Sequence, residues 1–294
     1  LFSFGYNILE LKPNEIKSNA VYFLKPNAEN LNEVEVIARN TKIFSLKRLK
    51  DFEGTSINAG KKNEVILVQE SLANLASNNA RQIFAQVPGL NIYQNDDAGL
   101  QLNIGGRGLD PNRSSNFNTR QNGYDISADV LGYPESYYAP PSEALSQIQI
   151  IRGAASLQYG TQFGGLVNFI FKAPNKNKKI NVKLRNTIGT NNLYTNFTNI
   201  SGVLDKISYN VIYNHKNGSG FRPNSNFESD NLFFNIGYEF DSTTNLNLEF
   251  TKFNYLSQQA GGLTDNMFNE NPFQSNRERN WFAIDWFLYN LKFV

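Results

Sequence analysis

From about Ile180 to the end of the chain, apolar and polar residues alternate with a period of two. Ile180, Val182 and Leu184 alternate with Asn181 and Lys183. Successive side chains of a β-strand point to opposite faces, so this pattern predicts long amphipathic strands. Their apolar face is rich in aromatic residues, and their other face is mostly polar. The same alternation recurs in 207–214, 232–240 and 246–250.

The connections between these predicted strands are alternately short and long. The links 202–205 and 241–244 have four residues each, whereas 215–229 and 257–280 are long and polar. Transmembrane β-barrels combine short turns on one side with long loops on the other. A soluble sandwich shares the alternation, but the connection lengths favour a barrel. About six strands are predicted, whereas a closed barrel needs at least about eight strands. We therefore expect an incomplete antiparallel transmembrane barrel.

Composition excludes several classes of protein. No segment of the 294 residues reaches the roughly 18 consecutive apolar residues of a membrane helix. A net charge of +2, from interspersed basic and acidic residues, does not indicate nucleic-acid binding. Without cysteine the chain has no disulfides or thiolate metal sites. Since it starts at Leu1 without a signal peptide, we expect a sequence cut at its N-terminus.

Residues 64–172 have a different pattern, in which glycines separate short β-branched and aromatic stretches. Short strands joined by tight turns are expected from it. One helix is predicted around 79–86, with Asn78 or Asn79 as N-cap and Pro88-Gly89 as the stop. The segment is therefore predicted to be a small α+β domain, a mixed sheet with short helices, in front of the barrel strands.

No catalytic or metal-binding constellation is visible in the sequence. GGRGLD lacks the strand-turn-helix context of a dinucleotide fingerprint, and no nucleophile stands beside a base. His215 has no cysteine or second histidine to share a metal with. Asp96-Asp97 is interpreted as a turn. We therefore predict no catalytic residue, no bound metal and no cofactor.

Five sequence blocks occur in the order found in one family. They are LNEVEVIA, NARQIFAQVPGLNI, IGGRGL, QNGY and ALSQIQIIRGAASLQYGTQFGGLVNFIFK. Together they resemble the plug domain of TonB-dependent outer-membrane receptors, and the strands that follow resemble the start of their barrel. The stretch from RGLDPNRSS to YYAPP and the terminal NRERNWFAIDWFLYNLKF are most similar to the ferric dicitrate branch.

This resemblance implies a fragment of a receptor in the outer membrane of a Gram-negative bacterium. The implied regions are 1–30, a remnant of a carboxypeptidase-regulatory-like sandwich; 31–63, a TonB-box-like segment and linker; 64–172, the plug; and 173–294, the first barrel strands. The implied function is active uptake of a ferric chelate, with citrate as the favoured chelator. The implied partners are the periplasmic protein TonB, the chelate and outer-membrane lipid.

The segment implied to bind TonB is short, extended and rich in valine, which suits pairing with the edge of a partner's sheet. Its residues are Glu33, Val34, Glu35, Val36, Ile37 and Ala38. The alternative is that EVEVIA is an edge strand of the N-terminal sandwich.

Four charged residues suggest a latch between plug and barrel. Arg107 and Arg152 stand beside glycines of the plug, and Glu239 and Glu249 fall on the polar face of two barrel strands. A buried arginine needs a carboxylate partner, because an unpaired buried charge costs several kcal/mol. The alternative is that all four are solvated surface charges.

Polar residues of the plug loops are the candidates for ligand binding. Guanidinium groups bind carboxylates through two parallel hydrogen bonds, which suits citrate. The candidates are Arg113, Ser114, Arg120, Gln121 and Gln162. Arg222 and the arginines of 277–279, in predicted extracellular loops, add positive charge. The alternative is that these side chains bond to the plug itself.

Two other functions remain open. One is a receptor for an oligosaccharide or another nutrient on the same fold. The other is a soluble β-rich binding or adhesion protein, whose strands would not form one continuous apolar belt.

Overall fold

The computed structural model of the chain describes residues 21–24, 46–53, 56–58, 62–128 and 132–294. The chain forms two units, 1–42 and 43–294, and everything below concerns the second. The sandwich remnant and the TonB-box-like segment predicted in 1–45 lie almost entirely outside the described residues. No helix in the described ranges is long and apolar enough to cross a membrane.

The plug is built on a mixed six-stranded sheet with the order β1-β4-β9-β10-β7-β8. Strands β10 and β7 are parallel, and the other neighbours are antiparallel. Two hairpins, β2–β3 and β5–β6, accompany the sheet. The strands are β1 (Leu46–Lys47), β2 (Phe52–Glu53), β3 (Ser56–Ile57), β4 (Lys62–Leu67), β5 (Leu90–Tyr93), β6 (Asn103–Gly106), β7 (Phe117–Gln121), β8 (Tyr124–Asp125), β9 (Leu145–Arg152) and β10 (Gly165–Phe171). This confirms the predicted mixed sheet.

Short helices connect these strands. They are η2 (Val68–Glu70), α1 (Ala80–Ile83), η4 (Ser142–Ala144) and η5 (Gly153–Gln158). The side chain of Asn79 caps α1 by accepting a hydrogen bond from the Gln82 backbone N–H (3.1 Å), as predicted. The helix ends at Ile83, earlier than expected, because the chain turns at Phe84, where the Val87 N–H donates to the Phe84 carbonyl (3.0 Å).

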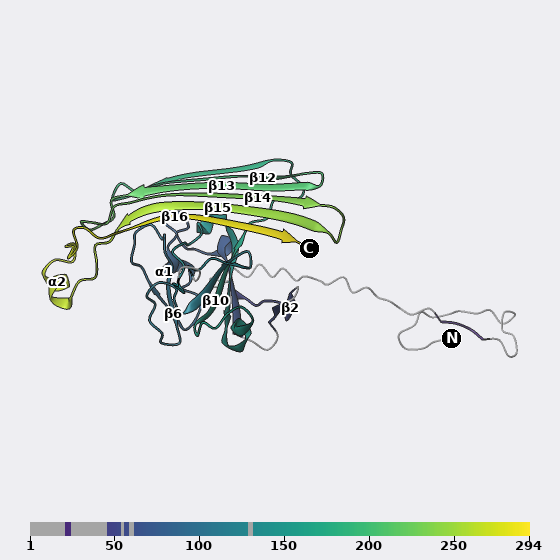
Figure 1. Ribbon diagram of the computed structural model, residues 1–294, viewed down its shortest axis with the longest axis horizontal. Helices are drawn as coiled ribbons and strands as arrows, with labels where there is room; N and C mark the ends of the chain where they lie inside the picture. The colour runs from purple at the N-terminus through teal and green to yellow at the C-terminus, as the bar shows by residue number, and fades with distance from the viewer. Residues whose placement is uncertain (1–20, 25–45, 54–55, 59–61, 129–131) are drawn as a thin grey trace. The chain divides into compact units, whose positions relative to one another are not determined.

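The second sheet is an antiparallel meander of six long strands in sequence order (Figure 1). They are β11 (Asn181–Ile188), β12 (Tyr194–Leu204), β13 (Ile207–Gly218), β14 (Phe227–Glu239), β15 (Asn245–Gln258) and β16 (Trp281–Phe293). The connections at one end are short. The connection after β15 is long and contains α2 (Asp265–Glu270), at the opposite end of the sheet. The predicted six-stranded meander is confirmed.

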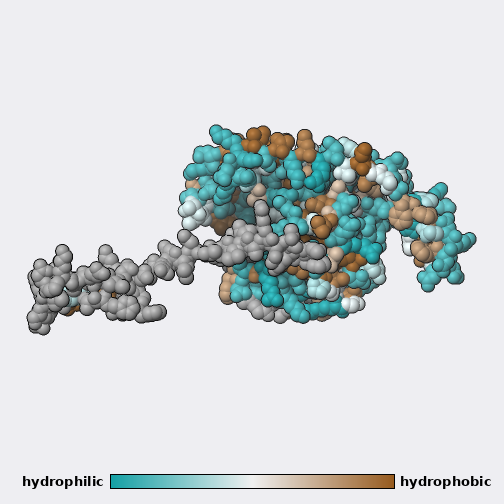
Figure 2. All heavy atoms as spheres, turned by 180° about the vertical axis from the view of Figure 1, so that it is seen from behind, coloured by the Kyte–Doolittle hydropathy of each residue, from teal (hydrophilic) through white to brown (hydrophobic). Residues whose placement is uncertain are grey.

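The two faces of this sheet differ as the alternation predicts. On the outward face, register joins one apolar row across all six strands, namely Val182, Ile200, Val211, Phe234, Phe250 and Tyr289. Figure 2 shows hydrophobic side chains gathered along this side of the molecule. A row without interruption is what a lipid-facing barrel wall requires, and it argues against the soluble alternative.

The inward face packs on the plug. Phe171 at the end of β10 stacks on Phe233 of β14, with ring centroids 4.1 Å apart. Tyr138 of the plug lies against Phe253 of β15, with centroids 4.7 Å apart. The central plug strands are therefore buried on both faces. Side chains that are at most 1% exposed include Ile66, Ile104, Phe117, Ile148, Ile150 and Val167.

We expect Phe117→Ala to lower the free energy of unfolding by about 3–5 kcal/mol, because Phe117 is fully buried and its loss leaves a cavity. Phe163→Ala is the matched control, since Phe163 is 81% exposed and should change stability by less than about 0.5 kcal/mol. Denaturant unfolding of the purified protein in detergent measures both. Equal effects would contradict this assignment of the core.

Candidate functional site

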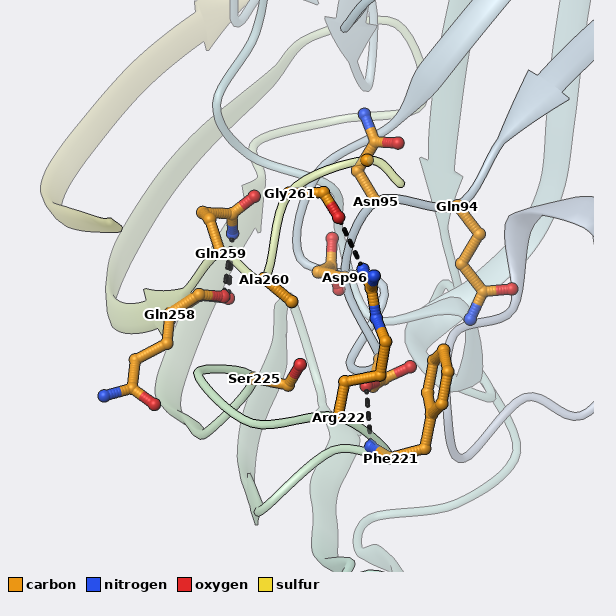
Figure 3. Close-up of a pocket in the computed structure, with 13 residues that line it drawn as sticks. Gln94, Asn95, Asp96, Phe221, Arg222, Ser225, Gln258, Gln259, Ala260 and Gly261 are labelled. Carbon is orange, nitrogen blue, oxygen red and sulfur yellow. Dashed lines mark hydrogen bonds between the residues drawn. The ribbon is translucent and has the colours of Figure 1, made fainter. Parts of the chain in front are cut away.

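A cavity of about 380 Å³ lies where a plug loop meets the connections at the α2 end of the long strands. The plug contributes 94–97, the β13–β14 connection contributes Phe221, Arg222 and Ser225, and the end of β15 contributes 257–262. Figure 3 shows these side chains surrounding the opening. Three chain segments that are distant in sequence therefore share one polar site.

The plug loop of the cavity is held in shape by Asp96. Its carboxylate accepts hydrogen bonds from the backbone N–H groups of Ala98 (2.9 Å), Leu100 (3.0 Å) and Gln101 (3.4 Å). This confirms the turn interpretation of Asp96-Asp97. Burial raises the pKa of Asp96 despite these bonds. The buried Lys216 of β13 donates to the Ala98 carbonyl (3.1 Å), so the wall also supports the turn.

Arg222 and Asp97 join the plug loop to the outer connections. The Asp97 carboxylate accepts from the Phe221 N–H (3.3 Å), and burial raises the pKa of Asp97. Arg222 donates to the Gly261 carbonyl (2.8 Å), which positions the β15–β16 connection over the cavity. Its Nε is buried and has no hydrogen-bond partner among the described residues. An unsatisfied buried donor is costly, so the hydrogen-bonding capacity of Arg222 is only partly used inside the protein.

The predicted ligand residue Arg113 lies beside the cavity without lining it. Its guanidinium donates to Glu135 (2.7 Å) and lies 5.4 Å from the ring centres of Tyr137 and Phe282. Phe282 is the register partner of Ser257, which lines the cavity. Burial opposes ionisation of Glu135, but hydrogen bonds from Tyr137 and Arg113 outweigh it and lower the pKa of that carboxyl.

The other four predicted ligand residues are not brought to the cavity. Ser114 is fully buried and its hydroxyl accepts from the Ser136 N–H (2.9 Å). Arg120 donates to Asn118 (2.7 Å) and to the carbonyls of Gly123 (2.6 Å) and Tyr159 (3.1 Å). Gln121 donates to Thr251 of β15 (3.0 Å). Gln162 is partly buried, and its Oε1 has no partner among the described residues.

The cavity residues that sequence reasoning missed are mostly amides. Gln94 and Asn95 precede Asp96, and Gln258 and Gln259 end β15. The signal available in the sequence was the polar runs QNDD and SQQAGG, which stand at the ends of apolar alternation. Nothing in the sequence showed that these two runs would meet.

The predicted arginine–glutamate latch is wrong in its pairing. Arg152 forms an ion pair with Glu64 inside the plug, because β4 and β9 are neighbours, and it also donates to the Pro88 carbonyl (2.9 Å). Arg107 and Glu239 are exposed. Glu249 does reach the plug, but it accepts from the Asn122 side chain (2.9 Å).

The contacts between plug and wall are instead mainly neutral hydrogen bonds. Besides the bonds of Gln121 and Asn122, Gln101 donates to the Tyr255 hydroxyl (2.6 Å) and Asn231 donates to the Tyr138 hydroxyl (3.2 Å). Among the described residues, one ion pair joins the plug to the wall, with its carboxylate in the plug and its arginine in the wall, which is the reverse of the prediction. It joins the plug carboxylate of Glu143 to Arg185 of β11 (2.7 Å).

The lowered pKa of Glu135 predicts a pH dependence of stability. A carboxyl whose pKa is lower in the folded than in the unfolded state stabilises the folded protein at pH values above the unfolded-state pKa. This stabilisation is lost as the pH falls through the folded-state pKa. We expect Glu135→Gln to lower the melting temperature at pH 6 but to have a smaller effect at pH 3. The exposed Glu270→Gln is the control, and an effect of Glu135→Gln that is independent of pH would contradict the assignment.

Comparisons with known proteins agree with this architecture. Residues 61–166 match the family model of the TonB-dependent receptor plug domain. The ferric citrate transporter FecA, in its unliganded form, is 23% identical over 74% of this chain and 34% of its own, with a TM-score of 0.61. The ferripyoverdine receptor of the outer membrane of Pseudomonas aeruginosa is 13% identical over 79% and 31%, with a TM-score of 0.58.

The copper transporter OprC is 14% identical over 75% of this chain and 33% of its own, with a TM-score of 0.56. Likenesses at these identities establish the fold. The chain spans about a third of the length of each of these structures. Taken with the match of residues 61–166 to the plug domain, they show that the chain has the fold of the first part of a TonB-dependent receptor, a plug followed by antiparallel strands.

Proposed function

We propose that this protein takes up a ferric chelate across the outer membrane with energy supplied through TonB, and that the chelate is citrate-like. The cavity at the α2 end of the strands is its proposed first binding site. The single observation that carries the proposal is the partly satisfied Arg222 in that cavity. The likeness to a ferric citrate transporter supports the choice of ligand.

The geometry of the cavity suits a ligand with several oxygen acceptors. Arg222 lines the cavity and offers it a charged guanidinium, which can bind a carboxylate. The amides of Gln94, Asn95 and Gln259 offer neutral donors around it. We propose that Arg113 supports these cavity side chains from beside the cavity, through its contact with the ring of Phe282. Ligand contacts by Ser114, Arg120, Gln121 or Gln162 would require the plug to rearrange, because they lie away from the cavity.

The plug must rearrange before any ligand passes. Its core is packed against the inward face of the strands through Phe171 and Tyr138. A pull from the N-terminal side would act first on β1 and β4, which form one edge of the plug sheet. TonB is the proposed source of this force, and 33–38, outside the described residues, is the proposed attachment segment.

Arg222→Gln tests the ligand site. Loss of a charged hydrogen bond should weaken ferric citrate binding by about 1.5–3 kcal/mol, or roughly 10- to 100-fold. Arg48→Gln is the matched control, because Arg48 is an exposed arginine directly after β1 that does not line the cavity, so the affinity should stay unchanged. Calorimetry on the purified receptor measures both. If the unmutated receptor binds no ferric citrate, citrate is removed and the transporter class remains.

Val36→Pro tests the proposed TonB segment. Proline removes a backbone donor needed for pairing with a partner strand, so energised uptake of labelled iron should be abolished while surface binding persists. Val21→Pro, in the segment that precedes it, is the comparison and should retain uptake. Equal loss of binding and uptake in Val36→Pro would indicate misfolding, and unchanged uptake would place the TonB segment elsewhere.

A second candidate ligand is a hydroxyl-rich nutrient such as an oligosaccharide. It is favoured by the lining of the cavity, where the amides can donate to and accept from sugar hydroxyls and the Asp97 carboxylate can accept from them. The same calorimetry distinguishes the candidates, because an uncharged sugar should bind with little dependence on salt, whereas a ferric citrate anion should bind more weakly as salt rises.

A further inference from the structure

Three cationic side chains gather near the buried residue Glu143, where the plug continues into the first barrel strand. Glu143 of η4 is 1% exposed. Arg185 of β11 lies 2.7 Å from its carboxylate, and Lys172 donates to its backbone carbonyl (2.7 Å). Lys183, two residues before Arg185, lies over the ring of Phe197 at 5.9 Å and close to Lys172. We call these four residues the Glu143 cluster.

The charges of the Glu143 cluster do not balance. Glu143 is the one carboxylate that acts on Lys172 among the described residues, against the positive charges of Lys183 and Arg185. Burial, followed by the charge of Lys183, lowers the pKa of Lys172 to about 8. Like charges held together beside the protein interior are costly, since the effective dielectric constant there is low. A bound anion would relieve this repulsion.

The cluster is open to a small ligand and faces the inside of the barrel. The side chain of Arg185 is 44% exposed, and Lys183 is partly exposed. Register places Lys183 beside Asn199 of β12, which is buried on the plug side of the sheet. Continued across the sheet, this row reaches Thr251 of β15, six residues before the cavity residue Ser257. At ~3.4 Å per residue, the cluster lies roughly 20 Å deeper along the strands than the cavity.

We propose that Lys172, Lys183 and Arg185 form a second, internal binding site for a small oxyanion that carries two or more negative charges. If the proposed function holds, the anion is the citrate of the chelate, bound part of the way along the wall. Free phosphate and the phosphate of a lipid headgroup share the same chemistry. In each case Arg185 supplies a planar pair of donors, and the two lysines supply point charges.

Competitive amine labelling tests the site without requiring transport. The whole purified receptor in detergent is acylated at pH 8 with and without citrate or inorganic phosphate, and each lysine is quantified by mass spectrometry. A bound anion raises the pKa of a neighbouring amine, so a rise of one unit from about 8 should slow labelling of Lys172 about fivefold. Lys206 and Lys252, away from the cluster, are internal controls whose labelling should not change.

The variant Arg185→Gln should remove most of the protection at Lys172, whereas the exposed Arg48→Gln should retain it. Both variants are first checked for an unchanged melting temperature. If Arg185→Gln does not fold, Lys183→Gln replaces it, since Lys183 has no hydrogen bond to Glu143. Protection by citrate and phosphate alike supports a general oxyanion site, and protection by citrate alone supports a chelate site. Unchanged labelling of Lys172 and Lys183 with both anions overturns the proposal.

Uptake measurements separate this inference from the proposed function. With labelled ferric citrate, Lys183→Gln should slow uptake several-fold without changing surface affinity, and the outward-facing Lys252→Gln should change neither. If the unmutated receptor shows anion protection but no citrate uptake, the internal site stands and the proposed ligand fails. If citrate uptake is normal in Lys183→Gln and protection is absent, the internal site is overturned and the proposed function stands.

Discussion

The contact between the plug and the inward face of the strands connects two halves of the chain that are patterned differently. Each wall strand presents apolar residues outward. On its inward face it must present side chains to which the plug can bind. It does so mostly with neutral groups, such as Thr251 to Gln121 and Tyr255 to Gln101. Each such bond contributes only about 1 kcal/mol, whereas breaking a buried ion pair costs about 3–5 kcal/mol. A seam of many weak bonds can be released one bond at a time, which suits the rearrangement of the plug that the proposed uptake requires.

The features that the sequence predicted well depend on residues that are close together in the sequence. The period of two around Tyr209 and Val211 defines which face of β13 is outward, whatever the strand pairs with. The cap of α1 is likewise local, since Asn79 binds a backbone N–H three residues away. The five plug motifs added the domain type, which neither composition nor periodicity could supply.

The features that sequence missed depend on which distant segments become neighbours. The sequence predicts a carboxylate of the wall as the partner of Arg152 in the plug. Sheet order instead places β4 beside β9, and Glu64 neutralises Arg152 across 88 residues of sequence. The cavity is similar, because Arg222 acquires its role only when the β13–β14 connection meets the plug loop at Asp97. Residue types show that a charge needs a partner, but the choice among several carboxylates is made by topology.

The cavity and the Glu143 cluster, which lie at different depths along the inward face of the strands, differ in their net charge. Near the cavity, the carboxylates of Asp96 and Asp97 are offset by Lys216 and Arg222, so the local charge is close to neutral. Recognition there must depend on hydrogen-bond geometry, which selects among ligands but attracts them weakly from a distance. At the Glu143 cluster the positive charges exceed the negative ones, and attraction rather than geometry dominates. In the proposed order of binding, an anion is selected by hydrogen-bond geometry at the cavity and is then attracted by the excess positive charge of the Glu143 cluster, further along the strands.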